Sequence, residues 1–183
     1  MSTPPFDPPS ARDIAIVSAQ LGRPARNVIG ISARCVCGAP TVVSTSPRLQ
    51  DGTPFPTLYY LSHPAATAAV STLEANVVMT ELTALLTGEV AEQYSAAHSA
   101  YLADRATIAD VPEINGISAG GMPTRVKCLH ALVGHTLAAG PGVNPIGDRA
   151  LALATWSPDV CQCVDYALED EPSEPATGGG IPA

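Results

Sequence analysis

The N-terminal third of the chain carries one helical pattern of hydrophobic positions followed by three extended ones. An apolar stripe at helical spacing follows Ser10, a residue type that caps helices, and predicts a helix over residues 11–21. Three short runs rich in Val, Ile, Thr or Tyr are each bounded by Gly, Pro or Asp. They predict strands over residues 27–35, 41–45 and 57–61.

After Pro64 the pattern changes to helices that Gly and Pro residues separate. The predicted helices span residues 65–75, 79–86, 89–105, 125–139 and 145–155. A loop rich in Gly and Pro covers residues 106–124, and Thr124 offers a cap for the helix that follows. The pattern therefore predicts an α+β fold, in which a small antiparallel sheet of about three strands packs with five or six helices. These strands and helices are predicted to form a single domain over residues 10–164.

Composition and charge set the two ends apart from this domain. Residues 165–183 hold five of the 17 acidic residues, no basic residue and a Gly run, which predicts a disordered acidic tail. Residues 1–9 contain four Pro and are predicted to be flexible. The nine basic residues of the chain are too few for the usual basic nucleic-acid-binding protein, so no nucleic acid partner is expected. The chain has no apolar run of membrane-spanning length and no secretory signal, which predicts a cytoplasmic protein without a membrane span.

Five cysteines carry the clearest chemical signal. Cys35 and Cys37 form one C-x-C pair, Cys161 and Cys163 form a second, and Cys128 stands alone. An odd count without a secretory signal argues against disulfides. The thiols could instead hold zinc or an iron–sulfur cluster, or they could be inert thiols of a metal-free protein.

The spacing of the pairs narrows the predicted ligand set. The two side chains of a C-x-C on a strand point to opposite faces, so one thiol from each pair is expected to bind the metal. Cys128 and His63 would complete the set, since His63 stands where the third strand gives way to a helix. On a helix over residues 125–139, Cys128 and His130 lie on different faces and are not expected to share an ion.

A second candidate site precedes that helix. Gly120 and Gly121 allow unusual backbone angles, and Arg125 and Lys127, the only lysine, flank the expected helix start. With His130 one turn further, these residues predict an anion-binding or phosphate-binding site, with simple packing of the glycine loop as the alternative. His98 is expected to be exposed. Four carboxylates have no visible partner for acid–base chemistry: Glu74, Glu81, Asp104 and Glu113.

Three segments, RCVCGAPTVVSTSPRLQDGTPFPTLYYLSHP, GISAGGMPTRVKCLH and NPIGD, resemble the bacterial family called domain of unknown function 501. The resemblance covers roughly residues 11–163. It implies that many relatives carry Cys in place of His63, and Cys and His interchange as zinc ligands, although His63 suits an all-thiolate cluster less well. It also implies genes that lie beside those for enolase, a septum-formation initiator and an exopolyphosphatase, mainly in Gram-positive bacteria. A cytoplasmic protein linked to cell division, envelope growth or phosphate metabolism would follow.

Three functional classes remain open from the sequence. The first is a protein that binds a structural or regulatory metal, zinc rather than iron–sulfur, and a protein partner. The second is a metal- or phosphate-dependent hydrolase that uses Arg125, Lys127 and His130 around a phosphate-containing ligand. The third is a metal-free interaction module whose cysteines only pack.

Overall fold

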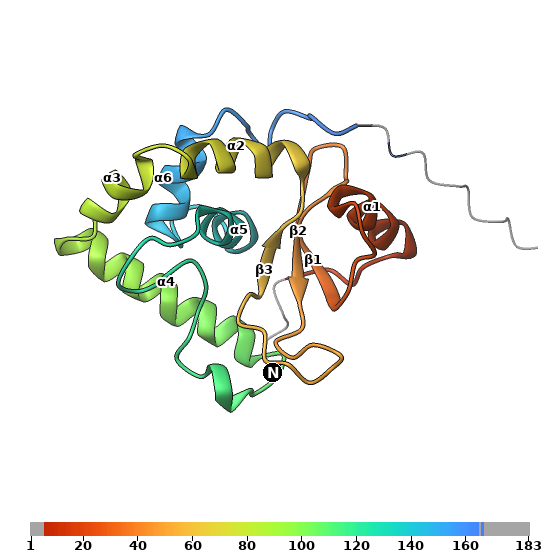
Figure 1. Cartoon of the computed structure of the whole chain (residues 1–183), viewed down its shortest axis with the longest axis horizontal. Coiled ribbons are helices and arrows are strands. Elements are labelled where there is room, and N and C mark those ends of the chain that lie inside the picture. The colour runs from red at the N-terminus through yellow and green to blue at the C-terminus, as the bar shows by residue number, and fades with distance from the viewer. Residues whose placement is uncertain (1–5, 165, 167–183) are drawn as a thin grey trace, which may run out of the picture.

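A three-stranded antiparallel sheet separates one helix from the other five in the computed structural model, which describes residues 6–164 and 166 (Figure 1). The strands are β1 (Val28–Arg34), β2 (Pro40–Thr45) and β3 (Tyr59–Leu61), in the order β1-β2-β3. The predicted α+β class, with three strands and six α-helices among the described residues, is confirmed.

Helix α1 (Ala11–Leu21) has the predicted bounds because both of its ends are encoded locally. The Ser10 hydroxyl accepts the Asp13 amide, and the Asp13 carboxylate accepts the Ser10 amide in return. Gly22 ends the helix with a left-handed backbone, φ 64°. The apolar side of α1 covers one face of the sheet through Val17, Ile31 and Val43.

The remaining helices form a layer on the opposite face. They are α2 (Pro64–Glu74), α3 (Val78–Ala84), α4 (Gly88–Ala106), α5 (Leu129–Ala139) and α6 (Pro145–Leu153), with a 3-10 turn, η1, at Pro112–Ile114. Helix α5 lies at the centre of this layer and contacts the sheet, α2 and α6 (Figure 1). The predicted helices are therefore present, each within a few residues of its expected ends except α5.

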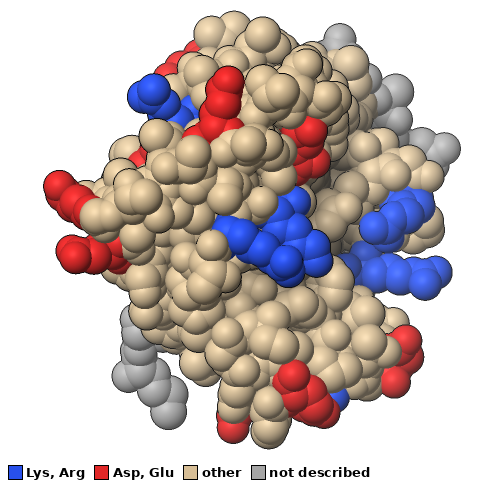
Figure 2. Space-filling view, turned by 60° about the vertical axis from the view of Figure 1, so that its left-hand side comes forward, with Lys and Arg blue, Asp and Glu red and all other residues tan. Residues whose placement is uncertain are grey.

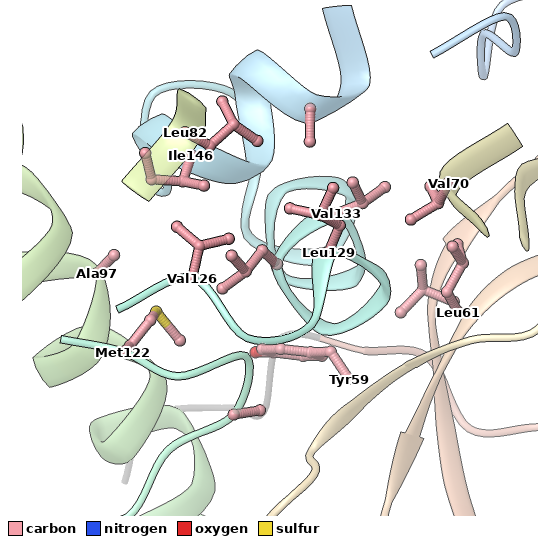
Figure 3. Close-up of a cluster of buried hydrophobic side chains, with 14 of the residues drawn as sticks. Tyr59, Leu61, Val70, Leu82, Ala97, Met122, Val126, Leu129, Val133 and Ile146 are labelled. Atoms are coloured by element: carbon pink, nitrogen blue, oxygen red, sulfur yellow. The ribbon is translucent and has the colours of Figure 1, made fainter. Parts of the chain in front are cut away.

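The main core lies between α5 and the sheet. Tyr59 and Leu61 of β3 face Leu129 and Val133 of α5, and Ile146 of α6 packs on the other side of α5 (Figure 3). All six residues of the central strand β2 are buried. Because successive residues of a strand alternate between its faces, β2 contributes to both cores.

The start of α5 differs from the prediction, which placed it at residue 125. The Lys127 and Cys128 amides both donate to the Gly120 carbonyl, at 2.7 and 3.3 Å, and hold this segment outside the helix. Cys128 is the N-cap residue, with an extended backbone. The predicted cap at Thr124 is wrong, since the glycine loop binds the amides that a helix start would have left free.

The N-terminal segment contacts the sheet where it is described. Asp7 exchanges two backbone hydrogen bonds with Ile31, at 2.8 and 3.0 Å, along the open edge of β1. Residues 6–9 of the segment predicted to be flexible therefore include a contact with the sheet. Residues 1–5, 165 and 167–183, which hold nearly all of the predicted acidic tail, lie outside the described residues.

The described surface is poor in charge, as the composition of 14% charged residues requires. On the face in Figure 2 the basic side chains form small groups on a mostly uncharged surface. None of the helices in the described ranges has both the length and the apolar character needed to cross a bilayer.

Candidate metal centre

The first cysteine pair lies in the turn that joins β1 to β2. The Cys35 amide donates to the Ala39 carbonyl, and the Gly38 amide donates to the Cys35 carbonyl, both at 2.8 Å. Gly38 has a φ of 89°, which closes the turn at little steric cost. Because Cys35 and Cys37 sit in a turn, the opposite orientation expected for a C-x-C on a strand does not apply.

The second pair lies in the irregular segment that follows α6. This segment runs back along α2 toward the β1–β2 turn (Figure 1). Trp156 anchors its start: its side chain is buried, and its ring lies 5.4 Å from the His63 ring at the N-terminus of α2. Cys161 and Cys163 thereby reach a turn that lies more than 120 residues away in sequence.

The four paired cysteines converge. The sulfur atoms of Cys35, Cys37, Cys161 and Cys163 all lie within 4.8 Å of one another, and the Cys37 and Cys163 sulfurs are 3.4 Å apart. Four thiolates around one zinc ion, at Zn–S distances of about 2.3 Å, lie about 3.8 Å from one another. The arrangement therefore has the size of a tetrahedral four-sulfur site.

The electrostatics of the cluster favour a cation. Burial raises the pKa values of Cys35 and Cys163, so these thiols resist ionisation. A hydrogen bond from the Ala39 amide lowers the pKa of Cys37 to about 7, so this thiol loses its proton first. Four thiolates cannot stay ionised this close together without a positive charge between them, and a divalent metal supplies that charge.

His63 lies next to this cluster and is fully buried. Its Nδ1 accepts the Ala66 amide at 3.4 Å, which caps α2, so the ring proton belongs on Nε2. Nε2 is 3.2 Å from the Cys163 sulfur and can donate to it. The ring orientation therefore suits a hydrogen bond to a thiolate, where the sequence predicted a metal ligand.

The cluster is open to solvent on one side. A pocket of about 700 Å³ borders Cys37, Cys161 and Cys163, and Cys37 and Cys161 are exposed. Arg34, at the end of β1, forms an ion pair of 2.6 Å with Asp13 of α1 in the wall of the same pocket. This opening gives a metal ion a path to the thiols.

The structure places Cys128 elsewhere, beside Glu74 and His130. One ligand atom from each of these three residues lies within 4.8 Å of the other two. A hydrogen bond with Cys128, and the charge and hydrogen bond of Glu74, raise the pKa of His130 to about 9. The expectation that Cys128 and His130 point apart was wrong, because Cys128 precedes the helix and is not part of it.

The glycine loop of the predicted anion site packs against the segment that precedes α5. The Gly121 carbonyl accepts the Arg125 amide at 3.1 Å, and the Gly120 carbonyl accepts the Lys127 amide. A Cβ atom on Gly120 would collide with Leu132, so this glycine lets the loop approach α5 closely. The loop therefore has a packing role, and anion binding by Arg125, Lys127 and His130 stays a prediction.

Two other histidines are bound inside the protein. His98 is half-buried, with Nδ1 2.8 Å from the Ser118 hydroxyl, so its predicted exposure was wrong. His135 is fully buried between Tyr59 and Tyr101.

Residues 31–152, two thirds of the chain, match the family described as Protein of unknown function (DUF501). The chain belongs to this family. No curated protein and no solved structure matches it.

The matched range divides the candidate ligands of this DUF501 protein. It includes Cys35, Cys37, His63 and Cys128, and it ends before Cys161 and Cys163.

The sequence indicated both cysteine pairs but did not indicate Glu74 as a partner for Cys128 and His130. Glu74 lies more than 50 residues before them, so no local spacing could have revealed this contact.

Proposed function

We propose that this DUF501 protein binds one structural or regulatory zinc ion through Cys35, Cys37, Cys161 and Cys163. The observation that carries the proposal is the approach of all four sulfurs to within 4.8 Å of one another. Thiolates bound to separate iron atoms of a cluster lie further apart, so this distance favours a mononuclear ion over an iron–sulfur cluster. Among mononuclear four-sulfur sites, zinc is the usual occupant.

The metal would join two distant parts of the chain. One pair of ligands belongs to the β1–β2 turn, and the other follows α6, on a segment that contains neither helix nor strand from Val160 to Val164. In such a site the free energy of metal binding is part of the free energy of folding. Zinc would therefore hold the C-terminal segment on the sheet and on α2.

His63 would support the site from outside the ligand set. A hydrogen bond from Nε2 to the Cys163 sulfur stabilises the thiolate form and restrains its orientation, as outer partners do at metal sites. The His63 ring is itself held by the Ala66 amide and by Trp156. This role replaces the direct ligation expected from the sequence.

The cytoplasmic location and the protein partner are also proposals. Free thiols persist in reducing compartments, which supports a cytoplasmic protein. A protein partner in cell division or envelope growth, and a phosphate-containing ligand, stay predictions from the sequence and the family resemblance.

The test compares the metal content and thermal stability of full-length protein purified without oxygen. The double variant Cys37→Ser, Cys163→Ser should lose one equivalent of zinc and melt at a temperature several degrees lower, because the C-terminal segment loses its attachment. The matched control is Glu81→Gln, which changes an exposed side chain of α3 that lies outside the cluster.

The control should retain the zinc of the cluster. Wild-type protein without metal, or a double variant with unchanged zinc content, would contradict the proposal. Visible absorption typical of iron–sulfur clusters would show that the thiols bind a different metal centre.

A further inference from the structure

A second group of metal-binding side chains, which shares no residue with the four-cysteine cluster, consists of Glu74, Cys128 and His130. Glu74 is the last residue of α2, Cys128 caps α5, and His130 belongs to the first turn of α5. The three side chains are partly exposed. A carboxylate, a thiol and an imidazole thus meet where two helix ends come together.

The hydrogen bonds of His130 determine which ring nitrogen faces this group. Nε2 lies 3.2 Å from the Thr67 carbonyl and 3.1 Å from the Ser71 hydroxyl, both on α2. A carbonyl only accepts, so Nε2 carries a proton. Nδ1 is left facing Glu74, whose Oε1 is 3.1 Å away. Histidine ligands in metal sites are oriented in the same way, by donating the other N–H to a carbonyl.

Glu74 is fixed as well. Its Oε1 accepts the Leu129 amide at 2.6 Å, at the N-terminus of α5. This hydrogen bond fixes the position of the carboxylate in the protein without a bound metal ion. Outer contacts that orient each ligand are a general property of metal sites.

The contact between His130 and Glu74 needs a positive charge. A neutral His130 would turn the lone pair of Nδ1 toward a carboxylate oxygen, and two acceptors at 3.1 Å repel each other. Either a proton or a metal ion resolves this contact. A divalent ion would take the place of the proton on Nδ1, beside the Glu74 carboxylate and the Cys128 sulfur.

We propose that Glu74, Cys128 and His130 form a second metal site, for a zinc-like divalent ion, that is independent of the four-cysteine cluster. Sulfur, nitrogen and oxygen donors together suit zinc and similar first-row ions. Three protein ligands leave the fourth tetrahedral position for water or another small ligand. The ion at this site is therefore expected to exchange more readily than the ion held by four thiolates.

The experiment titrates full-length, metal-free protein with Co²⁺, whose charge-transfer absorption reports cobalt–thiolate bonds. Wild-type protein should bind two equivalents. Cys128→Ser should bind one and lose about one fifth of the thiolate absorption at saturation, because it removes one of five cobalt–sulfur bonds. Ser is a favourable N-cap residue, so the start of α5 is preserved.

Two further variants separate ligation from folding. Glu74→Gln keeps an oxygen that can accept the Leu129 amide but lacks the charge, and should weaken binding of the second equivalent at least tenfold. Glu81→Gln, on the exposed side of α3, is the matched control and should bind both equivalents as wild type does.

The outcomes distinguish the two metal sites. Two equivalents in wild type, and one in Cys128→Ser, support the second site. One equivalent in wild type that persists in Cys128→Ser overturns the second site and leaves the cluster intact. One equivalent that is lost in Cys128→Ser but kept in the double variant of Cys37 and Cys163 supports the second site and contradicts the cluster.

Discussion

Acidification should destabilise this protein through His135, which is fully buried between two tyrosines. Its ring stacks on Tyr59, with ring centroids 5.7 Å apart, and packs edge-on against Tyr101. Nδ1 lies 3.2 Å from the Asn144 side-chain nitrogen, from which it accepts. The Asn144 oxygen in turn accepts the Gly147 amide at 2.9 Å. A proton on Nδ1 would face a donor that cannot turn over without breaking the cap of α6.

Burial lowers the pKa of His135 from 6.5 to about 4. The unfolded chain therefore binds a proton below about pH 6.5, whereas the folded protein binds it only near pH 4. Stability is unaffected by this group above pH 7 and is lost as the pH falls through this interval. At about 1.36 kcal/mol for each pKa unit, the loss between pH 7 and pH 4 is about 3 kcal/mol.

Urea unfolding at several pH values, followed by circular dichroism, measures this effect. The wild-type protein is compared with His135→Gln, which removes the titrating group and keeps a polar side chain. Other groups, including the cluster thiols, titrate in both proteins and cancel in the comparison. Wild type should lose about 3 kcal/mol more than the variant between pH 7 and pH 4. Parallel pH profiles for the two proteins would refute this explanation.

Three substitutions test the packing and capping described above, each by urea unfolding at pH 7. Ser10→Ala removes the N-cap of α1 and should cost about 1 kcal/mol; an unchanged stability would show that the capping box contributes nothing. Gly147→Ala places a methyl group against the Leu132 carbonyl where α6 crosses α5, and should cost about 1–3 kcal/mol, unless the helices separate freely. Arg105→Met leaves three backbone carbonyls, which the buried guanidinium binds at 2.6–3.1 Å, without a donor, and should cost at least about 2 kcal/mol; a smaller loss would mean that water replaces the side chain.

The contrast between α1 and α5 shows how far local sequence determines structure here. Ser10, Asp13 and Gly22 encode both ends of α1 within the helix and its flanks, and the predicted bounds are confirmed. Thr124 offers a similar cap for α5, but the Gly120 carbonyl takes the amides of Lys127 and Cys128 and delays the helix to Leu129. A loop that competes for the same amides cannot be foreseen from capping preferences alone.

The candidate sites divide in the same way. The two C-x-C pairs were visible in the sequence, yet their position in a turn and in an irregular segment decides that both thiols of each pair can converge. The contact of Glu74 with His130 depends on the packing of α2 against α5, which no local pattern records. Residue types could thus be predicted from the sequence, whereas the grouping of ligands required the tertiary structure.

X-ray absorption at the zinc edge identifies the atoms that surround the ion in the four-cysteine cluster. The measurement uses full-length Cys128→Ser protein loaded with one equivalent of zinc, so that the second site does not contribute its thiolate. If the proposed ligand set is right, the zinc ion has four sulfur neighbours at about 2.3 Å and no nitrogen neighbour, because Nε2 of His63 is expected to donate to the Cys163 sulfur. A zinc ion surrounded mainly by nitrogen or oxygen, or protein that retains no zinc, would contradict it.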